Sequence, residues 1–321
     1  MNTVKFQLYN ELITEQHNIE NAYIKFGLYQ PLNLNIFITH RCQCDCNFCF
    51  DKDNNIDVEH GSIDYLIKID PFNKIYLKGL QKSIEYLLSA RIDFEFTITG
   101  GEPTLHPTRF LEAFKILKKY NIKQRTISTN GLNLLTLHKG KPLIQYLVDY
   151  GYTHNVSISR MSIDEELHDK IMGGPTISNK QLERIAAFSK YNDIELRVSM
   201  NLLKKSINSL QDCLEAVNFY SNIDINTILF RELQGIDNSI TLHNIFNSIE
   251  NSSEFKHISK VKSIFYDVDI YKYRDNNREF IVKCYQDKKP NKEITSSFSY
   301  SEGILREGFR GTIIKDFRWI K

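Results

Sequence analysis

The sequence has no long apolar run and no excess of charge of either sign. It contains no stretch of about 18 apolar residues, the length that a membrane-spanning helix needs. Residues 1–20 lack the apolar segment of an export signal. Lys and Arg number 41 against 39 Asp and Glu, so no whole-protein field attracts nucleic acid or anionic lipid. We therefore expect a cytoplasmic protein with neither a nucleic-acid nor a membrane partner.

Cysteine is scarce except at one place. Of six cysteines, Cys213 and Cys284 stand alone. The other four fall within eight residues: Cys42, Cys44, Cys46 and Cys49. Because a reducing cytosol does not maintain disulfides, such a cluster predicts a metal site or catalysis.

The sequence also lacks low-complexity segments and linkers rich in Pro, Gly or Ser. Instead, strand-like apolar runs alternate with helical patterns, which predicts βαβ units and a parallel sheet. The expected strands are 34–39, 94–99, 124–129, 154–159, 194–201 and 225–231, and the expected helices are 107–120, 178–190 and 206–220. Six such units predict an α/β fold that is a partial (β/α)6 barrel, similar to a TIM barrel but not closed.

Several of these strands alternate apolar and polar residues. In 94–99, Phe94, Phe96 and Ile98 are separated by polar side chains. With a side-chain period of two, one face of the sheet is apolar and packs against helices, while the inner face is polar. This favours an open barrel that holds a polar ligand. The alternative is that Thr and Ser are simply tolerated in strands.

The pattern changes after residue 235. Residues 241–258 look helical, and two β-type stretches, 262–273 and 279–285, flank a turn and suggest a hairpin. Residues 311–320 suggest one more strand. We expect an N-terminal extension at 1–33, the barrel at 34–235 and a C-terminal α+β extension at 236–321 that caps the barrel.

Cys42, Cys46 and Cys49 have the spacing C-x3-C-x2-C, with the aromatic Phe48 before the last cysteine. They follow the first expected strand, at the edge of a parallel sheet where active sites form. This motif resembles the signature of the radical S-adenosylmethionine (SAM) superfamily. The resemblance implies a 4Fe-4S cluster in which the three thiolates hold three of the four irons. SAM would bind the fourth iron.

A second segment strengthens the resemblance. Strand 94–99 runs directly into Gly100-Gly101-Glu102-Pro103. Glycine lets a backbone approach a ligand closely, and a carboxylate can accept from an ammonium group. In the family this segment binds the SAM amino group. The core resembles the branch that contains molybdenum-cofactor cyclases and peptide maturases.

Polar residues at other strand ends agree with the same family. The resemblance implies that they contact the ribose, carboxylate and adenine of SAM; they are Ser128, Asn130, Ser157, Ser159 and Asn201. Ser159-Arg160 departs from the Leu-Asp pair common at this point in the cyclase branch. That departure weakens any transfer of the cyclase substrate.

Cys44 lies inside the motif but off the family spacing. It is either a bystander or a sign that the cluster of cysteines, with His40, binds zinc. Zinc would not explain the Gly100–Pro103 segment. A two-cysteine redox motif at Cys46 and Cys49 would leave Cys42 without a role.

Three further features lie outside these motifs. Cys213 lies on the apolar stripe of its helix and is expected to be buried. Cys284 is expected to be more open, and is either structural or a hydrogen-atom donor to a substrate radical. Gly173–Pro175 end either a mobile lid or a surface loop.

The resemblance implies an activity. An electron donor of the flavodoxin or ferredoxin type reduces the cluster, SAM is cleaved, and the 5′-deoxyadenosyl radical takes hydrogen from a substrate. Only Cys213 and Cys284 follow the barrel motifs, too few for a second cluster, so we expect a small polar substrate: a nucleotide, sugar or amino-acid derivative. The alternatives are a peptide maturase and a catalytically silent SAM-binding protein.

Overall fold

In the computed structural model, the described residues form two compact units. The cysteine unit comprises Tyr23–Val156, Gly173–Pro175 and Lys292–Lys321, and the hairpin unit comprises Ser157–Met172 and Thr176–Asn291. Within these ranges, the residues that the structure describes are 23–25, 28–49, 70, 72–152, 155–233, 242–262, 266–274, 279–288, 295–309 and 311–319.

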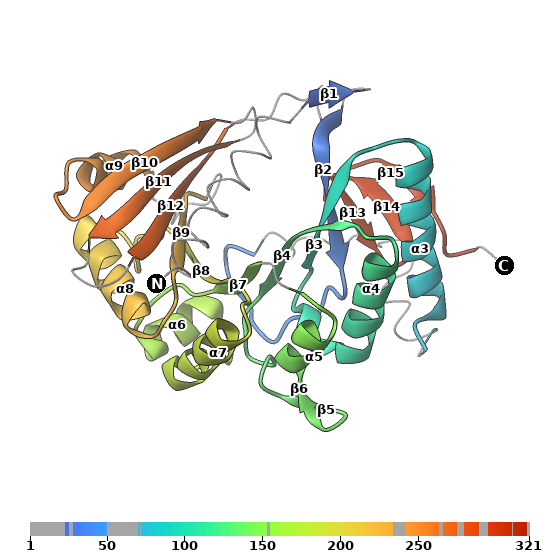
Figure 1. Ribbon diagram of the computed structural model, residues 1–321, viewed down its shortest axis with the longest axis horizontal. Helices are drawn as coiled ribbons and strands as arrows, with labels where there is room; N and C mark the ends of the chain where they lie inside the picture. Colours follow the sequence, from blue (N-terminus) through green and yellow to red (C-terminus); the bar gives the residue numbers. More distant parts are fainter. Residues whose placement is uncertain are drawn as a thin grey trace. The chain divides into compact units, whose positions relative to one another are not determined.

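The cysteine unit is built on a mostly parallel sheet (Figure 1). Its strands pair in the order β4-β3-β2-β13-β14-β15, and the pairs among the first four of these strands are parallel. β1 pairs with β2. The strands are β1 (Tyr23–Lys25), β2 (Leu28–Phe37), β3 (Phe94–Thr99), β4 (Lys123–Thr129), β13 (Thr295–Ser301), β14 (Ile304–Glu307), β15 (Ile313–Asp316) and the short pair β5 (Leu137–His138) and β6 (Lys141–Pro142).

Three helices complete the cysteine unit: α3 (Lys74–Ser89), α4 (Pro107–Lys119) and α5 (Leu143–Asp149). The apolar stripe of α4 is buried as the sequence predicts, with Phe110, Phe114 and Leu117 at most 1% exposed. Phe114 packs edge-on against Phe96 of β3. Burial of this stripe is what fixes α4 against the sheet.

The hairpin unit continues the alternation of strands and helices. β8 and β9 are parallel, β9 and β12 are parallel, and β12-β11-β10 is an antiparallel run. Its elements are β7 (Asn155–Ser159, which begins in the cysteine unit), α6 (Glu165–Met172), α7 (Asn179–Tyr191), β8 (Leu196–Asn201), α8 (Leu210–Asn222), β9 (Thr227–Arg231), α9 (Leu242–Glu250), β10 (Phe255–Lys262), β11 (Tyr266–Arg274) and β12 (Glu279–Asp287).

The predicted α/β class is confirmed, and all six predicted barrel strands are present. The helix predicted at 178–190 begins after Ser178, whose side chain accepts from the Gln181 backbone in a capping box. The helix predicted at 206–220 begins four residues late, at Leu210. Ser209 provides its cap, again in a capping box.

Beyond residue 235 the prediction is only partly right. The predicted helix 241–258 is wrong after Glu250, because β10 begins at Phe255. The predicted hairpin is confirmed as β11 and β12, while its turn at 275–277 and the expected boundary at 235 lie outside the described residues. β12 pairs in parallel with β9, and β13 pairs in parallel with β2. Each of these two strands therefore extends a sheet. The division at 34–235 and 236–321 stays a prediction.

The predicted polar face is present in both units, with different surroundings. In β8, Leu196, Val198 and Met200 are buried, and the polar residues between them are half-buried. In β2 and β3 the polar side chains bond to one another: half-buried Asn33 donates to buried Asn35 at 3.0 Å and accepts from buried Thr97 at 2.9 Å. This paired row is structural, since buried polar groups need partners.

Among the described residues, none of the helices is long and apolar enough to cross a membrane.

Candidate active site

The cysteine loop, residues 38–49, leaves the C-terminal end of β2. Its four cysteines carry free thiols. Cys42 is exposed, Cys44 and Cys49 are half-buried, and Cys46 is buried. The Cys49 N–H donates to the Cys46 carbonyl oxygen at 3.1 Å, which closes a turn between two of the motif cysteines. The loop therefore presents its thiols from one short, folded segment.

The cysteine loop is joined to the Gly-Gly-Glu-Pro segment by backbone hydrogen bonds. Gly101 N–H donates to the Thr39 carbonyl at 2.8 Å, and Glu102 N–H donates to the Arg41 carbonyl at 2.7 Å. A Cβ on Gly100 would lie 2.3 Å from the Thr39 oxygen, and one on Gly101 would lie 2.2 Å from the Arg41 oxygen. The glycines are thus required for contact between the two loops, a reason the sequence alone did not indicate.

Glu102 has a buried side chain, 1% exposed, that bonds within the protein. Its Oε1 accepts from Thr104 N–H at 3.0 Å, from Thr104 Oγ1 at 2.5 Å and from Thr129 Oγ1 at 2.7 Å. Its Oε2 accepts from Asn130 N–H at 2.7 Å. Burial raises the pKa of this carboxyl group, and the four donors oppose that rise. The expectation that Glu102 accepts from an ammonium group stays a prediction.

Asn130, at the end of β4, faces the cysteine loop. Its Nδ2 lies 3.7 Å from Cys44 Sγ and 4.0 Å from Cys42 Sγ. Its Oδ1 accepts from Gln43 Nε2 at 3.3 Å. Gln43 Oε1 is a buried acceptor with no hydrogen-bond partner among the described residues. Of the strand-end residues expected at the site, Asn130 is therefore brought to the cysteines, whereas Ser128 is half-buried on β4.

The Gly173–Pro175 segment lies against the cysteine loop. A Cβ on Gly173 would lie 2.7 Å from the Asp45 carbonyl oxygen, and one on Gly174 would lie 2.3 Å from the Gln43 carbonyl oxygen. Cys44 Sγ lies 3.6 Å from the Pro175 carbonyl oxygen. We call these three residues the glycine strap. The sequence predicted a lid or a surface loop here and gave no sign of this contact.

One of the three motif sulfurs, Cys42 Sγ, has hydrogen-bond donors suited to a thiolate. The Cys44 N–H donates to Cys42 Sγ at 3.4 Å. A hydrogen bond between the Cys44 thiol and the Cys42 sulfur lowers the pKa of Cys42 and raises that of Cys44. Hydrogen bonds to sulfur are a known means of tuning iron–sulfur centres. The three free thiols of Cys42, Cys46 and Cys49 on one loop thus fit the donor set of a 4Fe-4S cluster.

A mononuclear metal site has no such support. No three His, Cys, Asp or Glu side chains converge as ligands of one ion in the part of the chain that the structure describes.

The remaining expected site residues belong to the hairpin unit. Ser157 is buried and Ser159 half-buried on β7, and Asn201 is half-buried at the end of β8. Arg160, the residue that departs from the cyclase pattern, is fully buried. Its guanidinium donates to the Ile177 carbonyl at 2.5 Å and to Asn179 Oδ1 at 2.6 Å, so in this structure it holds the start of α7.

The expectation that Cys284 is open is wrong. It is 1% exposed on β12, opposite Phe230 of β9 and Asp269 of β11. Burial raises its pKa well above the usual range of a thiol. The alternation of β12 places it on the face that α8 also covers, where Cys213 is fully buried as predicted.

Comparison with known families decides the class. The model of the radical SAM superfamily matches residues 36–216, more than half of the chain. The chain belongs to the radical SAM superfamily. Its cofactors are accordingly a 4Fe-4S cluster and SAM.

Curated relatives lie in the branch expected from the sequence. A probable GTP 3′,8-cyclase of Sulfurisphaera tokodaii is 27% identical over 68% of this chain and 62% of its own length. AlbA, an antilisterial bacteriocin subtilosin biosynthesis protein of Bacillus subtilis, is 24% identical over 58% of this chain and 37% of its own length. The chain thus spans less than two thirds of these relatives.

Among solved structures, methylornithine synthase (PylB) matches with a TM-score of 0.43 and 15% identity, over 73% of this chain and 60% of that chain.

Proposed function

We propose that this radical SAM enzyme acts on a small polar substrate with a negatively charged group, such as a nucleotide, sugar or amino-acid derivative. The supporting observation is a row of polar residues in the hairpin unit. Asn201, Arg231 and Tyr285 are register partners at the C-terminal ends of β8, β9 and β12. Ends of parallel strands are where α/β enzymes place substrate.

Basic residues share a face with these three residues. Arg197 precedes Asn201 on the same face of β8, and Lys283 precedes Tyr285 on the same face of β12. The Arg231 guanidinium lies 5.3 Å from the centroid of the Tyr285 ring. Nε of both Arg197 and Arg231 is buried without a hydrogen-bond partner in the described residues. A phosphate or carboxylate would supply the missing acceptors and offset the cost of burying these donors.

The cofactor residues are proposed as the sequence predicts. Cys42, Cys46 and Cys49 would hold the cluster. The residues proposed to contact SAM are Phe48, Gly100, Gly101, Glu102, Pro103, Ser128, Asn130, Ser157, Ser159 and Asn201. When bound, these cofactors supply one-electron cleavage of SAM and a carbon radical that abstracts hydrogen. The chain's own part is to fix the loops, orient the substrate C–H bond and exclude water.

The electron would come from a flavodoxin or ferredoxin, and the protein would work in the cytoplasm. Cys284 as a hydrogen-atom donor would require access that a side chain 1% exposed does not have in this structure. A peptide maturase is the second candidate, favoured by the similarity to the subtilosin biosynthesis protein. A short precursor gene beside this one would support it.

The test of function is anaerobic reconstitution with iron and sulfide, followed by SAM, dithionite and a mass-spectrometric assay for 5′-deoxyadenosine. We expect the nucleoside from the wild type and none from Cys42→Ala. Cys213→Ala is the matched control, because that thiol is buried in α8. A cluster without deoxyadenosine, with every candidate substrate tried, would indicate a silent binding protein. Where deoxyadenosine does form, deuterium transfer to it from labelled anionic substrates would separate the small-molecule and peptide hypotheses.

A further inference from the structure

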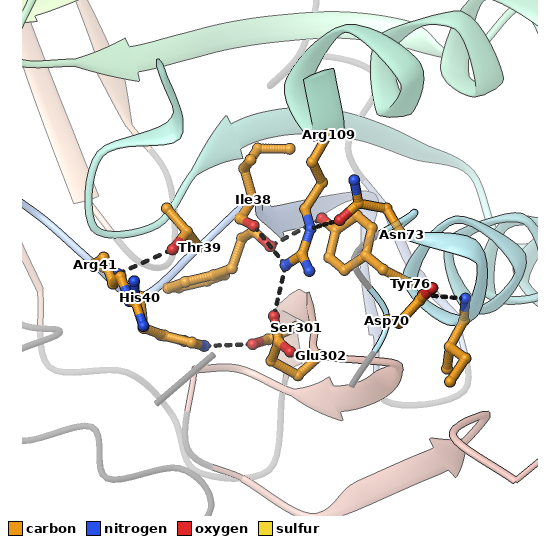
Figure 2. A network of polar contacts seen from close by, with 12 residues as sticks. Ile38, Thr39, His40, Arg41, Asp70, Asn73, Tyr76, Arg109, Ser301 and Glu302 are labelled. Carbon is orange, nitrogen blue, oxygen red and sulfur yellow. Dashed lines mark hydrogen bonds and ion pairs between the residues drawn. The ribbon is translucent and has the colours of Figure 1, made fainter. Parts of the chain in front are cut away.

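Arg109 of α4 is 1% exposed and lies in the middle of a network of polar contacts that includes the start of the cysteine loop (Figure 2). Its Nε donates to Asn73 Oδ1 at 2.8 Å. Its Nη1 donates to the Ile38 carbonyl at 3.0 Å and forms an ion pair with Glu302 Oε1 at 2.7 Å. The guanidinium carbon lies 4.3 Å from the centroid of the Tyr76 ring. One side chain thus joins the start of the cysteine loop, α3 and the turn between β13 and β14.

A second contact links the same two segments closer to the cysteines. His40 Nε2 is hydrogen-bonded to Ser301 Oγ, and His40 stacks on Phe37 with ring centroids 5.2 Å apart. His40 and Ile38 stand two and four residues before Cys42. The β13–β14 turn therefore contacts the cysteine loop at two points, through Glu302 by way of Arg109 and through Ser301 directly.

The turn itself is built to present these groups. Glu302 and Gly303 have φ values of 46° and 81°, both positive, as a two-residue hairpin turn requires. Such a conformation carries a cost for a residue other than glycine. Tyr300 Oη also donates to the Tyr76 carbonyl, and Tyr76 Oη donates to the Phe37 carbonyl at 2.9 Å. These hydrogen bonds fix β13, which leads into the turn, to α3, and they fix α3 to the end of β2.

A buried ion pair is a weak source of stability, because desolvation of two charges offsets most of their attraction. The effect of this ion pair on the position of the cysteine loop is more direct than its effect on stability. Arg109 Nη1 fixes the Ile38 carbonyl at a set position relative to two other segments, which limits where the next residues of the loop can go. Groups that orient ligand-bearing segments commonly change metal affinity about 10- to 100-fold when they are removed.

We propose that Arg109, Glu302 and Ser301 are positioning residues that hold the cysteine loop in the conformation that binds the cluster. The C-terminal hairpin β13–β14 is thereby part of the cofactor site, although it follows the last barrel strand by more than sixty residues. The proposal rests on the assignment of Cys42, Cys46 and Cys49 as cluster ligands. It concerns the retention of the cluster, not the substrate.

The test uses the full chain with Glu302→Gln and Ser301→Ala, and Leu117→Ala as the control. Leu117 is fully buried in the same helix as Arg109, so its truncation lowers stability without touching the network. Each protein is reconstituted anaerobically, its fold is checked by far-UV circular dichroism and thermal unfolding, and iron loss to a colorimetric chelator is timed. Reduced samples are also compared by electron paramagnetic resonance.

We expect both network variants to lose iron about tenfold faster than the wild type. Leu117→Ala should lose iron at the wild-type rate despite a lower melting temperature. Equal rates in all proteins, or a control as fast as Glu302→Gln, would overturn the proposal and leave the cysteine assignment intact. A wild type that binds no iron would instead reject the cysteine assignment itself. If Glu302→Gln does not fold, Ser301→Ala decides, because it removes only one hydroxyl group.

Discussion

Glu102 Oε2 accepts the backbone N–H of Asn130 at 2.7 Å, so the carboxylate after β3 holds the end of β4. Oε1 of the same group accepts from Thr129 Oγ1 at 2.7 Å. One side chain therefore braces two neighbouring strand ends at the edge of the sheet that carries the cysteine loop. Asn130, the residue so held, is also the one whose amide faces Cys42 and Cys44.

The first prediction concerns this brace. Glu102→Ala removes the acceptor of four buried donors, and we expect it to lower the free energy of unfolding by about 1.5–3 kcal/mol. It should also weaken SAM binding while the iron content is retained. Urea unfolding and calorimetric SAM titration measure the two effects.

A matched control for Glu102 lies on β3, the strand that Glu102 follows. Glu95, 2% exposed, pairs with Lys123 at 2.8 Å, away from the loops. Glu95→Ala should lower stability and leave SAM affinity unchanged. Unchanged SAM affinity in Glu102→Ala would remove this residue from the SAM site.

The second prediction concerns the glycine strap. Gly174→Ala would place a Cβ 2.3 Å from the Gln43 carbonyl oxygen, a backbone atom that cannot rotate away. We expect the cysteine loop to shift and iron content after reconstitution to fall by half or more. Gly140→Ala is the control: it has φ +84° but no atom within 4 Å of the new Cβ, so it tests backbone strain without a clash. Normal iron content in Gly174→Ala would show that the strap is dispensable.

Much of the fold could be predicted because local patterns and burial agree. The apolar stripe of Phe110, Phe114 and Leu117 predicted α4, and the alternation in residues 196–201 predicted β8 with its half-buried polar face. The missed elements carry weaker local signals. β13 reads TSSFSYS, with little apolar alternation, and it is a strand because it pairs with β2, hundreds of residues earlier in the sequence. Such long-range pairing overrides local propensity.

The site shows the same division. Two short motifs and their resemblance to a known family singled out Cys42, Cys46, Cys49 and the Gly100–Pro103 segment, because each motif is contiguous in the sequence. Arg109 and Glu302 could not be found that way, since each looks like an ordinary surface charge and becomes distinctive only when both are buried together. Cys284 was expected to be open, but pairing with β9 and β11 buries both edges of β12.

The third prediction separates Cys44 from the other cysteines of the loop. Its sulfur lies beside the Pro175 carbonyl and the Asn130 amide, and its position is off the C-x3-C-x2-C spacing. We expect Cys44→Ala to keep full iron and sulfide content after reconstitution, whereas Cys46→Ala should lose most of both. Loss of the cluster in Cys44→Ala would contradict the assignment of this residue as a bystander, and zinc in place of iron would revive the metal alternative.

The fourth prediction tests the burial of Cys284. Because burial raises its pKa, this thiol should be neutral at pH 8 and closed to reagents in the folded protein. We expect iodoacetamide to leave Cys284 unmodified in the native state and to label it after unfolding in urea, as peptide mass mapping would show. Half-buried Cys44 is the internal control for reagent activity. Rapid native labelling of Cys284 would restore the possibility of a role in hydrogen-atom transfer.

The last prediction is a pH effect that comes from His168 of α6. This side chain is fully buried near Arg160, and its Nδ1 accepts from the Met161 N–H at 3.2 Å. Burial first, and then the Arg160 charge, lower the pKa of His168 to about 3. The unfolded chain, with an ordinary histidine pKa of about 6.5, therefore binds a proton between pH 6.5 and 3 that the folded protein does not.

Stability must fall as the pH falls through this window, because protonation favours the unfolded state. At pH 5 the loss due to His168 is about 2 kcal/mol relative to pH 7.5. His168→Leu, which cannot titrate, should show a smaller decrease in the free energy of unfolding from pH 7.5 to 5 than the wild type, measured by urea unfolding. An identical pH dependence in His168→Leu and the wild type would mean that His168 takes up its proton in the folded state, and so would contradict its burial as a neutral group.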